Sequence, residues 1–422
     1  MEGVLKAVKM YYKRTIIMIT VINCAIVLCS CGKANKEYNE AVELIEDGKY
    51  EEAILHLETA IKKNDERAEY YIAYGMALNA ASRYKEAVKE FGKAYQDTDN
   101  EISGQNNKKL FFGQAVAYYG LNDYNKVIEA CDKALAIDQY GYMDEKLGKM
   151  KAAAAGFMEN FDLALETYNS LLEDNNLADI YFERAGLYEK LGDIKKAAKD
   201  YESAIKADKK CYDAYFALYN IYKNDKKNVF KDSSKLADDV ISLITDAKME
   251  SADEILQLGR AYYYMGDYSS AVSSLEKSLK GGCNEALYYL GTVKMAEKNY
   301  KEASSKFNEY ISKTGDTSIQ GTNVAQAYNQ LAGCYILLGD YENAESYINK
   351  GIALGTTSAR RTLIKNRVIL YEKTAQYKKA RKAARQYLNE FPDDDGMKKE
   401  LLFINTRIRT VSLGREAARA SE

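Results

Sequence analysis

The sequence has one proline, no tryptophan and one histidine among 422 residues. Folds built from strands and turns use proline and glycine at their turns, so a single proline favours helix along nearly the whole chain. One histidine, His56, leaves histidine-based catalysis and most metal sites without their side chains. No GxxxxGK[ST], HExxH or GxSxG motif occurs. We expect no enzymatic activity, no cofactor and no metal site.

The charge is nearly balanced. There are 60 basic and 62 acidic residues, which gives a net charge of −2. A general nucleic-acid binder needs a basic excess, so we expect no nucleic-acid partner. The four cysteines beyond residue 31 lie far apart and show no CxxC spacing, which argues against a redox or zinc motif.

The N-terminus has the pattern of an export signal. Lys13-Arg14 precedes an apolar run from Thr15 to Leu28. As a helix, 14 residues extend roughly 21 Å, which is short of the ~30 Å hydrocarbon core of a bilayer. A basic start, a short apolar run and small residues after it are typical of a cleaved signal peptide.

The residues that follow resemble the lipobox of bacterial lipoproteins. Leu28-Cys29-Ser30-Cys31 is followed by Gly32, which fits Leu-x-[small]-Cys. The resemblance implies that Cys31 carries diacylglycerol, that residues 1–30 are removed, and that a further acyl chain such as palmitate is added. Two chains hold a protein on a bilayer stably. We therefore expect a bacterial protein anchored by lipid to the cell membrane and facing its extracytoplasmic side.

One pattern recurs along the rest of the chain. It is seen in DGKYEEAILHLETAIKKN from Asp47, LGDIKKAAKDYESAIKAD from Leu191 and MGDYSSAVSSLEKSLKGG from Met265. Each segment has a turn, a large anchor residue, a small residue three positions later and an apolar residue four positions after that. The anchors recur about every 36 residues, and they are Tyr50, Tyr84, Tyr124, Phe161, Ile194, Tyr268, Tyr300, Tyr341 and Tyr377.

This pattern resembles the tetratricopeptide repeat, a helix-turn-helix unit of 34 residues. Leu258-Gly259 and Leu290-Gly291 match the Leu-Gly pair of its first helix. The resemblance implies an all-α fold, an α-solenoid wound as a right-handed superhelix. The residues that match the alanine of its second helix are Ala53, Ala87, Ala164, Ala197, Ala271, Ala303, Ala344 and Ala380.

The pattern also sets expected boundaries. Residues 31–36 form the lipidated cysteine and a short tether, 34–394 the solenoid, and 395–422 a C-terminal capping helix with a frayed tail after Val411. The sixth repeat is degenerate, and its second helix regains the spacing at Ala237, Ile241 and Ile244. Polar segments 102–107 and 315–323 are expected to be loops. The ten repeats are expected to start near residues 34, 68, 108, 145, 178, 212, 252, 284, 325 and 361.

The many tyrosines indicate a binding groove. The chain has 37 tyrosines, and most occupy packing positions. Others fall on the face of the first helices that lines the concave groove in this family, where aromatic side chains give large contact area at low entropy cost. The expected groove residues are Phe112, Tyr119, Phe182, Phe216, Tyr263, Tyr264 and Tyr288.

A second binding surface is expected at the C-terminal end. Residues 359–422 contain 16 basic and 8 acidic residues. Arginine suits forked contacts with carboxylate or phosphate, so the patch could meet an acidic protein or an anionic envelope polymer. We define the basic patch as Arg360, Arg361, Lys365, Arg367, Lys378, Lys379, Arg381, Lys382 and Arg385.

These features favour a scaffold or adaptor that binds proteins or peptides. Two alternatives stay open, an envelope-assembly chaperone and an accessory subunit of an enzyme acting on envelope polymers. The family's carboxylate-clamp subclass is not expected. Lys149 and Lys365 lie on the relevant face, but Ala153 and Ile369 stand where that subclass has asparagine.

Overall fold

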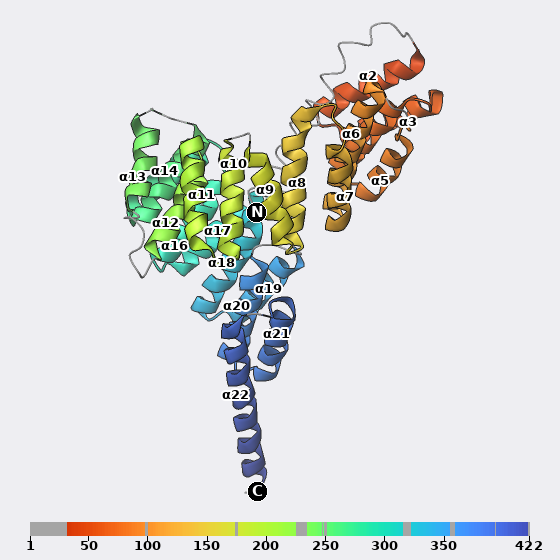
Figure 1. The fold of residues 1–422 in the computed structure, drawn as a ribbon. Helices are drawn as coiled ribbons and strands as arrows, with labels where there is room; N and C mark the ends of the chain where they lie inside the picture. The colour runs from red at the N-terminus through yellow and green to blue at the C-terminus, as the bar shows by residue number, and fades with distance from the viewer. Residues whose placement is uncertain are drawn as a thin grey trace. The chain divides into compact units, whose positions relative to one another are not determined.

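The computed structural model describes residues 32–420 except 98–99, 174–175, 225–233, 247, 249–250, 315–321, 355–358 and 393. The side chains of 322 and 411–420 are not described either. The expected signal peptide and Cys31 therefore lie outside the described residues. All regular structure in the described part is helical (Figure 1). None of these helices combines the length and the apolar character that crossing a bilayer requires.

The chain divides into two compact units, residues 1–217 and 218–422, and the division falls inside α12 (Tyr212–Lys223). In the first unit, each helix from α2 to α11 packs against the next one along the chain. The first helices of its early repeats also touch, α2 with α4, α4 with α6 and α6 with α8. The helices of this unit are α2 (Lys33–Glu46), α3 (Tyr50–Lys63), α4 (Ala68–Ala80), α5 (Tyr84–Lys93), α6 (Glu101–Gly120), α7 (Tyr124–Leu135), the 3₁₀ turn η1 (Gly141–Met143), α8 (Asp144–Phe157), α9 (Phe161–Glu173), α10 (Ala178–Lys190) and α11 (Ile194–Ala207).

The second unit repeats this arrangement. Each helix from α13 to α22 packs against its successor, and α14 touches α16, α16 touches α18 and α18 touches α20. Its helices are α13 (Ser234–Asp246), α14 (Ala252–Met265), α15 (Tyr268–Lys280), α16 (Glu285–Ala296), α17 (Tyr300–Thr314), α18 (Thr322–Leu338), α19 (Tyr341–Ala353), α20 (Arg360–Lys373), α21 (Tyr377–Glu390) and α22 (Asp395–Ala420).

Within the described residues, the helices from α2 to α21 form ten consecutive pairs, which confirms the all-α repeat architecture. Contact between successive helices, from α2 to α11 and from α13 to α22, is the packing of a solenoid. The first helices begin within three residues of the expected start in every repeat except the third, where α6 begins seven residues earlier.

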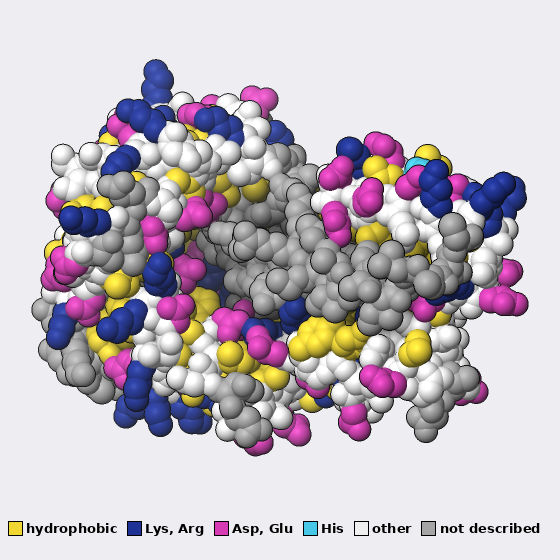
Figure 2. Space-filling model, turned by 90° about the horizontal axis from the view of Figure 1, so that it is seen from above, with side chains coloured by type: hydrophobic (Ala, Val, Ile, Leu, Met, Phe, Trp, Pro, Cys, Tyr) yellow, Lys and Arg dark blue, Asp and Glu magenta, His cyan; other side chains and the backbone are white. Residues whose placement is uncertain are grey.

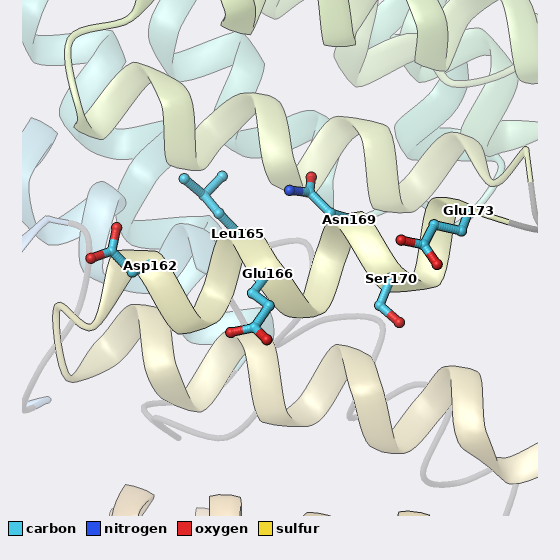
Figure 3. A pocket seen from close by; sticks show the side chains of 6 residues that line it. All are labelled: Asp162, Leu165, Glu166, Asn169, Ser170 and Glu173. Atoms are coloured by element: carbon cyan, nitrogen blue, oxygen red, sulfur yellow. The ribbon is translucent and has the colours of Figure 1, made fainter.

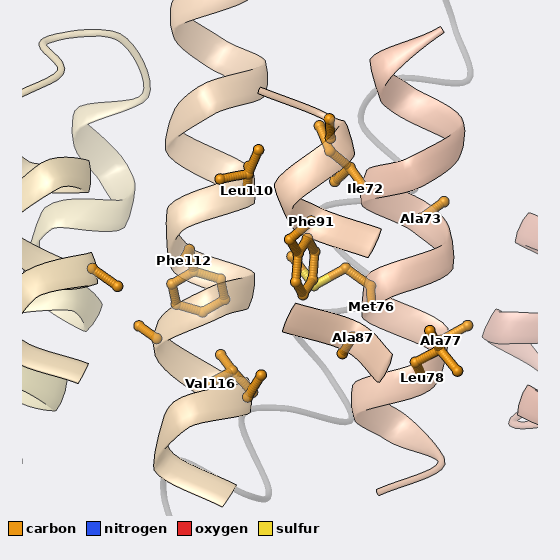
Figure 4. Close-up of a cluster of buried hydrophobic side chains, with 14 of the residues drawn as sticks. Ile72, Ala73, Met76, Ala77, Leu78, Ala87, Phe91, Leu110, Phe112 and Val116 are labelled. Carbon is orange, nitrogen blue, oxygen red and sulfur yellow. The ribbon is translucent and has the colours of Figure 1, made fainter. Parts of the chain in front are cut away.

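Small residues lie where the two helices of a repeat cross, as the pattern predicts. The eight alanines of the second helices have no exposed surface. Glycine in the first helix also allows close packing, because a large side chain of a neighbouring helix can approach its backbone. Phe91 of α5 is buried between α4 and α6 (Figure 4). A Cβ placed on Gly75 or Gly113 would lie 2.6 or 2.2 Å from the Phe91 ring.

The turn inside each repeat has a common backbone. In nine of the repeats, all with turns that the structure describes, the residue two positions before the anchor has a positive φ, between 53° and 82°. Only glycine adopts this left-handed region without steric cost. Four repeats have glycine there and five have a residue with a side chain. The positions are Gly48, Ser82, Asn122, Glu159, Gly192, Gly266, Lys298, Gly339 and Ala375.

The prediction of a loop at 102–107 is wrong, because these residues belong to α6. Asn100 and Ser103 form a reciprocal capping box at the start of the helix. The Asn107 side chain bonds both the backbone N–H and the carbonyl of Gln96, and Asn106 donates to the Gln96 side chain. The polar side chains that suggested a loop therefore tie the helix to the segment before it.

Two terminal boundaries also differ from expectation. Helix α2 begins at Lys33, so residues 33–36 are helical rather than a tether, and only Gly32 of that segment is described as non-helical. At the other end, α22 continues to Ala420, beyond the point where a frayed tail was expected. Its capping role is supported. Met397 and Ile404 are buried against α20 and α21, with Leu401 and Ile408 packed beside them.

The sixth repeat consists of α12 and α13, and residues 225–233 between them lie outside the described part. In α13, Ala237 and Ile244 are buried as expected. Val240 is the third buried residue, whereas Ile241 is only half-buried. The expected spacing is therefore right at two of its three positions.

Candidate partner-binding surfaces

Three of the seven predicted groove aromatics are buried, so the prediction that they contact a partner is wrong. Phe112, Tyr119 and Phe216 have 4%, 9% and 2% of their surface exposed. Phe112 belongs to the buried cluster of the first repeats (Figure 4). Tyr119 lies edge-on to the rings of Tyr124 and Phe157, with centroids 5.7 and 6.1 Å away. Where successive first helices touch, their large side chains fill the contact instead of facing solvent.

The other four aromatics are half-buried and pack on rings of their own unit. In the first unit, Phe182 lies 5.5 Å from Tyr201, centroid to centroid. In the second unit, Tyr264 accepts a 2.5 Å hydrogen bond at its carbonyl from the Tyr219 hydroxyl. The Tyr263 ring contacts the rings of Tyr264 and Tyr268. The Tyr288 ring contacts those of Tyr289, Phe307 and Tyr310. These four rings are partly exposed, so a partner could contact only the exposed part of each ring.

The basic patch separates into two parts, and the α20 part is used inside the protein. Arg360 forms a forked ion pair with Glu390, with N–O distances of 2.8 and 3.0 Å. Arg361 and Lys365 both lie 2.9 Å from Asp394. The Tyr387 hydroxyl and these two cations hold the pKa of the Asp394 carboxyl far below its usual range. These contacts fasten α20 to the end of α21 and to the start of α22. The three cations are therefore paired within the second unit, and their contact with a partner stays a prediction.

The fourth α20 residue, Arg367, donates to the Gln386 side chain at 2.9 Å. It therefore also bridges α20 to α21. In the sequence these partners lie 19 to 33 positions from the cations, so the local charge pattern does not indicate the pairing.

The α21 part of the basic patch faces solvent. Ala380, Ala383, Ala384 and Tyr387 set the buried side of this helix. The opposite side carries exposed cations, and Lys379 lies over the Tyr371 ring. Four other cations of the patch lie on this helix, and across the ranges that the structure describes no carboxylate lies within ion-pairing distance of them. We name these four residues the α21 basic face: the exposed Lys378, Lys382 and Arg385, and the half-buried Arg381 beside them.

An acidic surface lies on α9 in the first unit. An open hollow of about 580 Å³ follows one side of this helix, and no motif in the sequence pointed to it (Figure 3). Its carboxylates are the exposed Asp162, Glu166 and Glu173, and none has an ion-pair partner in the described part of the chain. Asn169 accepts from Arg184 of α10 at 2.7 Å, which orients one side of the hollow.

Neither lysine of the rejected carboxylate clamp is available. Lys149 pairs with Glu145 and Asp179, and Lys365 pairs with Asp394. The cysteines offer no nucleophile of the usual kind, since burial raises the pKa of the Cys131 and Cys334 thiols well above the ordinary value.

One face of the protein is mixed in charge. On the face seen in Figure 2, acidic and basic side chains are interspersed, with hydrophobic side chains in separate patches among them. Sequence reasoning missed one exposed apolar pair on α22, Leu402 and Phe403, which are 67% and 46% exposed. The apolar spacing of Met397, Leu401 and Ile404 could have revealed this pair, since Leu402 and Phe403 fall on the opposite side of that helix.

Comparison with known proteins agrees with this architecture. The curated relatives include a DnaJ protein P58IPK homolog from Oryza sativa, 26% identical over 299 residues, which cover 64% of this chain and 62% of the relative. A Hsp70-Hsp90 organizing protein from Triticum aestivum is 28% identical over 176 residues, 40% of this chain and 28% of that protein. The chain thus spans less than two thirds of the length of these relatives.

Solved structures include a tetratricopeptide repeat protein from Parabacteroides merdae, with 16% identity and a TM-score of 0.40 over 71% of this chain and 98% of that one. Family models of the tetratricopeptide repeat match residues 38–101 and 178–211 in the first unit, and 256–317 and 325–354 in the second. The chain therefore contains tetratricopeptide repeats in both of its units, within an all-helical repeat array.

Proposed function

We propose that this protein is a scaffold that binds other proteins or peptides, held at the extracytoplasmic face of a bacterial membrane by lipid on Cys31. The observation that supports the binding role is the repeat array itself, in which successive helices stack within each unit. Stacked repeats present an extended surface, and this architecture is used widely for protein recognition. The proposed role is non-enzymatic, because the sequence has no nucleotide-binding, zinc-protease or serine-hydrolase motif.

The α21 basic face is the proposed contact for an acidic partner. Lys378, Lys382 and Arg385 are exposed and recur at helical spacing, so they share one side of the helix. Exposed charges of this kind act over about 8 Å in physiological salt. We therefore expect partner binding through this face to weaken as the salt concentration rises.

Charge reversal tests this contact. We expect Lys378→Glu, Lys382→Glu and Arg385→Glu together to remove the acidic partners that the wild-type protein captures after crosslinking in intact cells. Quantitative mass spectrometry of the captured proteins is the measurement. The repeats should stay folded, because all three side chains point away from the buried row of α21.

The matched control reverses three exposed lysines of α11, Lys195, Lys199 and Lys206. It changes the net charge by the same amount on a different repeat. If both triple variants keep the same partners, the α21 basic face is only a solvated surface. The half-buried aromatics then become the better candidates.

Anchoring through Cys31 rests on the Leu28-Cys29-Ser30-Cys31 motif directly after an apolar run. We expect Cys31→Ser to abolish incorporation of a radiolabelled or alkyne-tagged fatty acid and to prevent signal cleavage, which leaves a larger species. Cys29→Ser, two residues earlier in the segment that is discarded, should incorporate the label normally. Normal labelling of Cys31→Ser would contradict the lipoprotein proposal and leave the repeat architecture untouched.

A further inference from the structure

The only histidine of the chain lies among four charged side chains in the first repeat. His56 of α3 faces Glu37 and Glu40, which are one turn apart on α2. Its Nδ1 atom lies 2.9 Å from Glu37 Oε2 and 3.3 Å from Glu40 Oε2. The three ligand-type atoms lie within 4.8 Å of one another, and all three side chains are partly exposed.

Two lysines complete the arrangement. Lys63 Nζ lies 2.6 Å from Glu37 Oε1, and Lys36 Nζ lies 3.6 Å from Glu40 Oε1. In each glutamate, one oxygen therefore faces a lysine and the other faces the imidazole. The contacts with Lys63 and His56 lower the pKa of the Glu37 carboxyl, so this group is anionic at neutral pH.

His56 Nδ1 is hydrogen-bonded to Glu37 Oε2, and Glu40 Oε2 approaches the same nitrogen, so all three ligand-type atoms converge on one point. A cation bound by all three atoms would take the place of the proton that they share. Zinc bonds to histidine nitrogen and carboxylate oxygen are about 2.0–2.2 Å, so two ligands of a tetrahedral ion are roughly 3.3 Å apart. The separation of 3.3 Å equals that value, and the 2.9 Å separation would widen by roughly 0.4 Å when zinc replaces the hydrogen bond.

We propose that His56 Nδ1, Glu37 Oε2 and Glu40 Oε2 bind one zinc ion in the first repeat. Imidazole nitrogen and carboxylate oxygen are both zinc ligands, and the fourth position is left to water. Lys63 donates a hydrogen bond to Glu37, and Lys36 lies in ion-pair contact with Glu40. Both lysines would then orient the ligating carboxylates. The ion would join α2 to α3, the two helices that begin the array.

Isothermal titration of zinc chloride into the purified full-length protein in detergent tests this proposal. We expect one zinc ion per chain to bind at this site, and His56→Gln and Glu40→Gln each to weaken its binding at least about tenfold. Glu43→Gln is the matched control, because Glu43 is an exposed residue of the same helix outside the cluster. It should bind zinc like the wild type.

A second measurement separates zinc binding from weak binding to the free thiols. A ligand that binds only the folded state raises the midpoint of thermal unfolding. Zinc should raise the midpoint of the wild type and of Glu43→Gln relative to EDTA, and raise that of His56→Gln less at the same zinc concentration. The four cysteines of the repeats are present in every variant. The proposal fails if His56→Gln binds zinc as tightly as the wild type, or if neither protein binds it.

Discussion

Replacing Ala197 with glutamate is expected to destabilise the first unit by about 3–5 kcal/mol, because it leaves a buried charge without a partner. Ala197 has no exposed surface and lies in α11, which packs along α10. A carboxyl group at this position must either stay ionised in the crossing or take up a proton, and both cost free energy.

The shape of the unfolding transition is as informative as its position. In a repeat array, stability is close to a sum of repeat terms and contacts between neighbours. A local lesion should therefore separate the unfolding of the residues before and after α11 in calorimetry. Lys199→Glu places the same carboxylate on the exposed side of this helix and should leave the transition almost unchanged. A single transition at the wild-type midpoint in Ala197→Glu would contradict nearest-neighbour stacking.

Phe91→Ala is expected to cost about 3–5 kcal/mol, the usual range for removing a fully buried phenylalanine. The Phe91 ring has no exposed surface and is the wedge between α4 and α6. Its removal leaves a cavity that the two backbones cannot close fully, since other side chains hold them apart. Chemical denaturation followed by far-UV circular dichroism gives the free energy of unfolding directly.

The glycines beside this ring supply the controls. Gly113→Ala places a methyl group 2.2 Å from the ring and should destabilise by about 1–3 kcal/mol through overpacking. Gly92→Ala, in α5 next to Phe91, meets no atom within 4 Å and should stabilise by up to about 1 kcal/mol. In the variant that combines Phe91→Ala and Gly113→Ala, the methyl group partly fills the cavity. Its loss should therefore be smaller than the sum of the two single losses, and strict additivity would argue against this wedge.

The repeat pattern predicted the packing of the array well, because packing positions recur. The alanines of the second helices lie buried as expected, and nine of ten repeat starts were located closely. The third start was missed for a local reason. Asn106 and Asn107 suggest a loop by composition, but their side chains bond Gln96 and keep the segment helical.

The surfaces were harder to predict, because exposure depends on contacts between residues that are distant in sequence. Phe112 was assigned to a groove, whereas the structure places it in the buried cluster of the first repeats. Arg360 was assigned to a binding surface, and its ion pair with Glu390 was not foreseen because the two residues lie 30 positions apart. His56 was expected to have no special role, since Glu37 is 19 positions away and no local motif links the two.

The left-handed turns have a consequence for the order in which the array opens. A residue with a side chain at this backbone position costs roughly 1–2 kcal/mol, whereas glycine does not. Four turns carry glycine, and five carry Ser82, Asn122, Glu159, Lys298 or Ala375. The repeats therefore differ in mechanical stability. Under a pulling force along the chain, the five helix pairs without glycine in the turn should unfold at a lower force than equally packed pairs that have glycine there.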